Sequence, residues 1–134
     1  MLGAWREAIP EAQLTVVDTP PGMAGAEVHD LAAAADLVLI PVPPHEMALE
    51  AVGELGMVLR ATFVLNMVDR SPEVTAARRH LARLSDLCPV EIPERVDVRR
   101  ETGAGGSVVE RPRAAGAAEM AALWRWAAGQ IGIG

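Results

Sequence analysis

The feature that most constrains the fold is an unbroken apolar run, LVLIPV, at residues 37–42. A strand with one solvated face alternates apolar and polar residues, whereas a continuous apolar run is typical of a strand covered on both faces in a parallel sheet. The run TFVLNMV at residues 62–68 is similar. Helices are therefore expected on both faces of a parallel sheet, and an aromatic content of 3% requires an aliphatic core.

Strand and helix signals alternate along the rest of the chain. Strands are expected at 14–17, 37–42, 62–68 and 89–93, helices at 24–35, 46–59, 72–87 and 114–130, and a glycine-rich loop at 102–107. This order predicts right-handed crossovers and an α/β fold with a parallel sheet of about four to five strands. A length of 134 residues without a long linker predicts one domain over residues 1–134.

Charge is unevenly distributed along the chain, and all 12 basic residues are arginines. Residues 1–69 have a net charge of −8, whereas residues 70–134 have a net charge of +2, within a total of −6. The second half leaves weak, non-specific DNA binding open, through Arg78, Arg79 and Arg83 on one predicted helix. A solvated helix face is the favoured explanation of the same arginines.

Other classes of site and location receive little support from the residues. No apolar run approaches the roughly 18 residues that a membrane span needs, so no membrane span is expected. Cys88 is the only cysteine, so no internal disulfide can form, and a cytoplasmic location is expected. His29, His45 and His80 have no metal-like spacing with Cys88, which argues against a zinc site.

Polar residues mark the ends of three predicted strands. Asp18 follows the first strand, Asn66 and Asp69 close the third, and Pro93 and Arg95 close the last. Each of these residues alone is explained by a turn. Because ligands of parallel sheets bind at the carboxyl ends of the strands, the set together predicts a ligand site.

Five segments, in order, resemble ParA/MinD-type partition ATPases of the P-loop superfamily. They are TVVDTPPG (15–22), AAADLVLIPV (33–42), FVLNMVDR (63–70), IPERV (92–96) and GSVVE (106–110). The first resembles the switch region, the second the strand that follows it, and the third the adenine-side strand and loop. The last two resemble the late loop and the approach to the final helix. The resemblance spans nearly the whole chain and implies an incomplete, N-terminally truncated P-loop NTPase fold.

The resemblance implies roles for five residues. Asp18 would be the catalytic Walker B-like acid that holds Mg²⁺ through water, and a carboxylate suits this hard cation. Gly22 would bring its backbone N–H to a γ-phosphate. Asn66 would recognise adenine by donating and accepting hydrogen bonds, with Pro93 and Arg95 beside the base. ATP and Mg²⁺ are cofactors by resemblance only, and the alternative is no cofactor.

The phosphate-binding half of the family pattern is missing. In the family, a strand and a glycine-rich loop with lysines precede the switch region, but nothing before Leu14 resembles them and the chain has no lysine. The run GAGGS at residues 103–107 is not followed by Gly-Lys-Ser/Thr. Phosphoryl transfer depends on positioning and on charge stabilisation, so no autonomous ATP hydrolysis is expected.

Two functions are therefore open. The first is a ParA-like partition or positioning protein, of the plasmid or chromosome partitioning type, without ATP hydrolysis of its own. The second is a non-catalytic interaction module derived from the fold, which binds a ParA-like or other protein. In the family the missing strand lies beside the 37–42 strand, so a rearranged sheet, a homodimer or a complementing protein chain is expected to fill its place.

Overall fold

The computed structural model describes residues 14–20 and 25–133. The chain divides into two compact units, Met1–Ala35 and Asp36–Gly134. In the described part of the first unit, the helix α2 (Ala26–Ala34) lies within the range predicted for it, and residues 14–20 adopt neither helix nor strand.

The strand predicted at residues 14–17 is wrong. All the strand pairs of the described structure join residues of the second unit, and the side chain of Val16 is 81% exposed. A high β propensity describes how well a side chain suits a pleated, half-buried surface. It does not produce a strand where no neighbouring strand receives the backbone hydrogen bonds.

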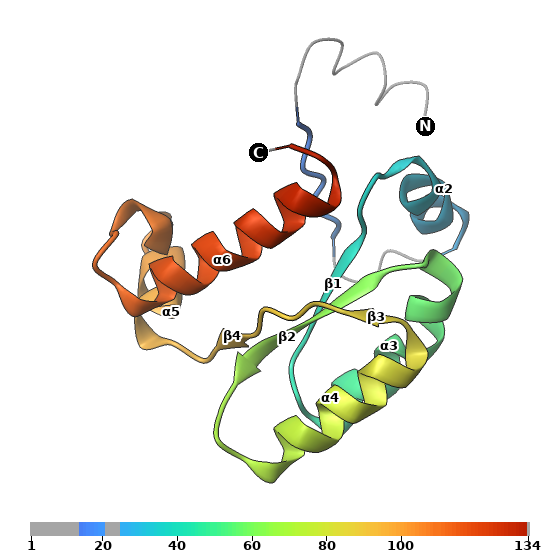
Figure 1. Cartoon of the computed structure of the whole chain (residues 1–134), viewed down its shortest axis with the longest axis horizontal. Coiled ribbons are helices and arrows are strands. Elements are labelled where there is room, and N and C mark those ends of the chain that lie inside the picture. The colour runs from blue at the N-terminus through green and yellow to red at the C-terminus, as the bar shows by residue number, and fades with distance from the viewer. Residues whose placement is uncertain (1–13, 21–24, 134) are drawn as a thin grey trace. The chain divides into compact units, whose positions relative to one another are not determined.

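The second unit is built on a parallel sheet whose central strand is β2 (Figure 1). Its elements are β1 (Leu39–Val42), α3 (Glu46–Leu59), β2 (Thr62–Val68), α4 (Pro72–Leu84), β3 (Asp86–Leu87), β4 (Ile92–Pro93), α5 (Val96–Gly103), the 3₁₀-helix η1 (Val108–Glu110) and α6 (Ala115–Gln130). Three strands, β1, β3 and β4, each pair with β2 in parallel. The predicted α/β class with a parallel sheet of about four to five strands is confirmed, with four strands in the described part of the chain.

The last strand differs from the prediction. Instead of one strand at 89–93, two short strands follow one another along β2, with β3 beside its start and β4 beside its end. The helix predicted to continue to Leu87 ends at Leu84, because the chain turns into β3. The Ser85 hydroxyl donates a hydrogen bond to the Ala61 carbonyl at 2.6 Å, which holds this turn against the start of β2.

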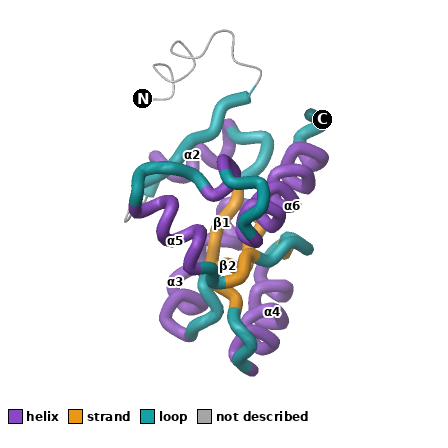
Figure 2. Tube along the Cα trace, turned by 90° about the vertical axis from the view of Figure 1, so that its left-hand side faces the viewer, coloured by secondary structure: helices purple, strands orange, loops and turns teal. Residues whose placement is uncertain are grey.

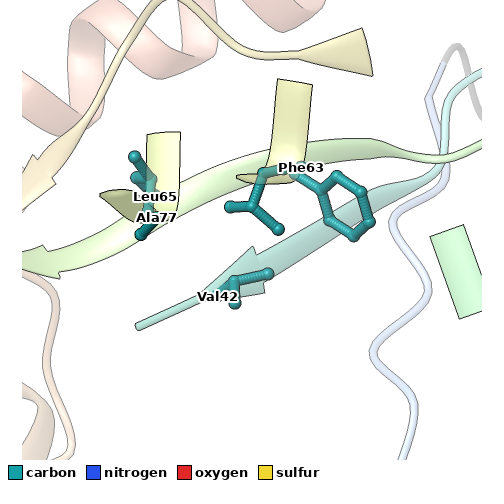
Figure 3. Close-up of a cluster of buried hydrophobic side chains, with 5 residues drawn as sticks. Val42, Phe63, Leu65 and Ala77 are labelled. Carbon is teal, nitrogen blue, oxygen red and sulfur yellow. The ribbon is translucent and has the colours of Figure 1, made fainter. Parts of the chain in front are cut away.

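Alternating side chains of β2 divide the core into two clusters. One consists of Val42, Phe63, Leu65, Ala77 and Leu81 (Figure 3), and side chains of α3 and α4 pack against it. The other consists of Val64, Cys88 and Ile92, against which Met120, Leu123 and Trp126 of α6 pack. Helices therefore cover both faces of the sheet, as predicted, with α3 and α4 on one face and α6 on the other (Figure 2).

The helix α5 was not predicted, and it is tied to the start of α6. Asp97 accepts hydrogen bonds from the backbone N–H of Val98 at 2.8 Å and from that of Gly116 at 3.3 Å. The first N–H groups of a helix have no partner within the helix, so Asp97 satisfies one of them from a neighbouring helix. This contact fixes where α6 begins.

Candidate functional site

The carboxyl ends of the strands border a hollow of about 350 Å³. It is lined by Pro43, Pro44, His45, Met67, Asp69, Ser71, Glu73 and Glu94. A second hollow, of about 520 Å³, is lined by Arg60 and by residues at the end of α4 and the start of β3, at the opposite end of the strands. Because ligands of parallel sheets bind at the carboxyl ends of the strands, the first hollow is the candidate site.

Two loops shape this hollow. Pro43 and Pro44 end β1, and the His45 N–H donates a hydrogen bond to the Pro43 carbonyl at 2.9 Å before α3 begins. After β2, the Ser71 N–H donates to Asp69 Oδ1 at 2.8 Å, a turn that leads into α4. The Ser71 side chain, and then its backbone N–H, hold the pKa of Asp69 below its ordinary value, so the carboxylate is charged at neutral pH.

Met67 lies at an irregularity in the sheet that alternation alone could not reveal. Its backbone φ is 56°, which is uncommon for a residue other than glycine, and the pairing of β2 with β4 shifts between Asn66 and Val68. Met67 is thus the extra residue of a β-bulge. The bulge returns Val68 to the cluster of Phe63 and Leu65, and it leaves the Met67 side chain 49% exposed at the hollow.

Replacing Met67 with glycine is expected to raise the free energy of unfolding by about 0.5–1 kcal/mol. The left-handed conformation costs an L-residue about 1–2 kcal/mol, and the greater chain entropy of glycine offsets about half of this gain. Urea denaturation measures the change. Met67→Ala keeps the Cβ atom and is the matched control, so an equal gain from alanine would contradict the assignment of strain to this backbone.

Two of the predicted site residues, Asn66 and Pro93, lie on strands that pair with each other, but neither residue lines the hollow. Asn66 of β2 pairs in register with Ile92, which precedes Pro93 in β4. Alternation along β2 places the Asn66 side chain on the face of Val64, the face that α6 covers. Asn66 and Pro93 are accordingly not among the lining residues.

Arginines near this edge are engaged by carboxylates. Arg95, which precedes α5, donates from Nε to Glu119 Oε1 at 3.1 Å, and this pairing with Glu119 raises the pKa of Arg95. Arg99 forms an ion pair with Glu94 at 2.6 Å. The Arg95 guanidinium, which was predicted to lie beside a base, therefore contacts the Glu119 carboxylate of α6 instead.

The remaining predicted residues are not among those that line the hollow. Asp18 lies in the exposed, irregular part of the first unit, so its predicted place at a strand end is not realised, and Gly22 lies outside the described residues. The three arginines proposed for DNA are all exposed, and Arg78 forms an ion pair with Glu91 at 2.7 Å.

The donor set around the hollow does not suit a phosphate chain with Mg²⁺. Of the carboxylates that line it, Glu94 is paired with Arg99, so Asp69 and Glu73 supply the negative charge that opposes phosphate binding. Over residues 14–20 and 25–133, no group of three or more His, Cys, Asp or Glu side chains is arranged to hold a metal ion. The negative charge of Asp69 and Glu73 favours a neutral or positively charged group over an anion at this edge.

Of the eight lining residues, only Asp69 was singled out from the sequence. The other seven are Pro43, Pro44, His45, Met67, Ser71, Glu73 and Glu94. His45 could have been proposed from the sequence, because it follows the two prolines that end the 37–42 run and therefore stands at a strand end. Met67 depends on the bulge, and Glu73 reaches the hollow from the first turn of α4. Their convergence requires the tertiary structure.

When the chain is compared with known proteins, no protein-family model, no curated protein and no solved structure matches it. What the structure defines is an α/β unit with a four-stranded parallel sheet covered by helices on both faces. Within the described ranges, no helix has the length and apolar character that crossing a membrane requires. The ParA/MinD relationship, with one such domain over residues 1–134, stays a prediction.

Proposed function

We propose that this chain is a ParA-like partition or positioning protein that does not hydrolyse ATP by itself. The five segments that resemble this family support the ParA-like part of the proposal. The carboxyl edge of the parallel sheet supports the absence of hydrolysis. Carboxylates line the hollow at this edge, and the neighbouring Arg95 and Arg99 are paired with Glu119 and Glu94. Catalysis of phosphoryl transfer needs positive charge in place of these groups.

The purified full chain with ATP and Mg²⁺ is expected to release phosphate at the rate of a protein-free control. Asp18→Ala is expected to leave that rate unchanged, because Asp18 lies in an exposed, irregular segment. A phosphate-release assay under steady-state conditions measures both proteins. Steady turnover by the natural chain that Asp18→Ala abolishes would refute the proposal.

A titration with two ligands separates recognition of a base from recognition of phosphates. Adenosine is expected to bind at least as tightly as ATP with Mg²⁺, because the phosphates meet the carboxylates of the hollow. Isothermal calorimetry on the full chain measures the comparison. Binding of ATP with Mg²⁺ about tenfold tighter than adenosine would show a phosphate-binding site and contradict the proposed electrostatics.

A second candidate function, a non-catalytic protein-interaction module, is favoured by a different observation. In the described part of the second unit, β1 pairs only with β2 and thus forms an edge of the sheet. Edge strands offer unpaired backbone groups to other chains. Size-exclusion chromatography with light scattering, on the full chain alone and with candidate partners, tests this function.

A further inference from the structure

The outer edge of β1 has a defined pattern of backbone groups. The Thr62 N–H donates to the Val38 carbonyl at 2.9 Å, so the backbone groups of even-numbered residues here point toward β2. In an extended strand, the groups of the alternate residues point the opposite way. The Leu39 N–H, the Leu39 carbonyl and the Pro41 carbonyl therefore point to the outer edge. A neighbouring strand could bond to one donor and two acceptors.

Pro41 lies at a position where its lack of a backbone N–H costs the sheet no hydrogen bond. Proline has no backbone N–H, and it is confined to edge strands or to positions where that N–H would point away from the ladder. Pro41 is exposed, and its nitrogen faces the outer edge, so the pairing of β1 with β2 loses no hydrogen bond. The edge is thus restricted in donors but retains its acceptors.

An apolar stripe lies on α3, which packs against β1. The stripe consists of Met47, Ala51 and Leu55, which are spaced by four residues and are all exposed, Met47 by 81%. The side chains that face the sheet are instead Ala48, Leu49 and Val52. Because α3 contacts β1 and α4, whereas α4 contacts β2 and β3, α3 lies on the β1 side of this layer and α4 on the β2 side (Figure 2). The exposed stripe belongs to neither of these contact faces of α3.

The charge around this edge indicates what kind of chain it can accept. Residues 36–59 contain four acidic residues and no arginine or lysine. Glu50, one turn of α3 beyond Met47, is exposed. A second copy of the chain would place one acidic α3 against another, whereas a chain with basic residues would complement the charge.

We propose that the outer edge of β1 and the apolar stripe of α3 together accept a β-strand and an adjoining amphipathic helix from a different protein, with arginine or lysine beside the apolar face of that helix. The strand extends the sheet through Leu39 and Pro41, and the helix packs on Met47, Ala51 and Leu55. This proposal rests on the interaction-module function and names its partner by chemistry.

The probe is a synthetic peptide with a five-residue strand of valine, isoleucine and threonine, followed by a leucine- and alanine-rich helix with arginines on its polar face. A matched peptide carries glutamate in place of arginine. Hydrogen exchange of the Leu39 amide in the full chain, followed by NMR, is expected to slow about tenfold or more with the arginine peptide and little with the glutamate peptide. Glu50→Arg is expected to lower the affinity of the chain for the arginine peptide. Glu110→Arg makes the same charge change on η1 and is expected to leave this affinity unchanged.

Three results would overturn the proposal. Protection of the Leu39 amide that grows with protein concentration, without peptide, would assign the edge to a second copy. Protection of the Leu39 amide in the free chain that does not depend on protein concentration would assign the edge to another segment of the same chain. Equal effects of the two peptides, or no effect of either, would refute a basic strand-and-helix partner. Light scattering with candidate partners decides the interaction-module function separately, because it detects association through any surface.

Discussion

Phe63→Ala is expected to lower the free energy of unfolding by about 3–5 kcal/mol. Phe63 is 0% exposed in the central strand β2, and its ring contributes to the cluster beneath α3 and α4 (Figure 3). Removing the ring leaves a cavity between sheet and helices. Because natural domains are stable by about 5–15 kcal/mol, such a loss takes a large part of the total. Urea denaturation followed by circular dichroism measures it.

Met47→Ala is the control for this substitution. Met47 is also a large apolar residue of the second unit, but its side chain is 81% exposed. Its replacement is expected to change the free energy of unfolding by no more than about 0.5 kcal/mol. Similar losses from Phe63→Ala and Met47→Ala would show that the two-cluster description of the core is wrong.

Gly116→Ala is expected to lower the free energy of unfolding by about 1–3 kcal/mol, because it overpacks the contact between α5 and α6. A Cβ atom on Gly116 would lie 2.5 Å from Val98 Cγ2 and 3.3 Å from Val108 Cγ2. The same residue donates its N–H to Asp97, so a shift of the helix would also strain that hydrogen bond. Thermal or urea denaturation measures the effect.

Gly129 lies on the same helix and gives the matched control. A Cβ atom there would meet nothing within 4 Å. Gly129→Ala is therefore expected to raise the free energy of unfolding by about 0.5–1 kcal/mol, through the higher helix propensity of alanine. Adding Val98→Ala to Gly116→Ala removes the clashing methyl groups, so a double-mutant cycle should show favourable coupling. Changes of the same sign at Gly116 and Gly129 would exclude a local clash.

The middle of the chain was predictable from the sequence because local signals agree with the tertiary environment. The helix at 46–59 and the strand at 62–68 have the predicted bounds. Pro43 and Pro44 separate the first of these elements from β1, and the apolar run of the second is buried by helices on both faces. The parallel order of the sheet follows from the alternation of strand and helix.

The remaining features depend on contacts that a local pattern does not contain. Residues 14–17 have the composition of a strand but no partner strand in the described structure. The start of α5 carries no capping side chain, so Val96–Gly103 gave little sign of a helix. The conformation of Met67 arises from the mismatch between β2 and β4. The hollow likewise joins residues from several loops, and its acidic character appears only when those loops meet.

The central place of β2 also has a consequence for the order of folding events. Leu39 pairs with Thr62, and Thr62 pairs with Asp86, so each strand pair closes a chain loop of fewer than about 30 residues. Short loop closures of this kind favour rapid folding for an α/β topology. Because every strand pair among the described residues includes β2, we expect substitutions in this strand to slow folding, and substitutions at the far end of α6 mainly to speed unfolding. Stopped-flow kinetics of Leu65→Ala and Ala128→Gly would distinguish the two effects.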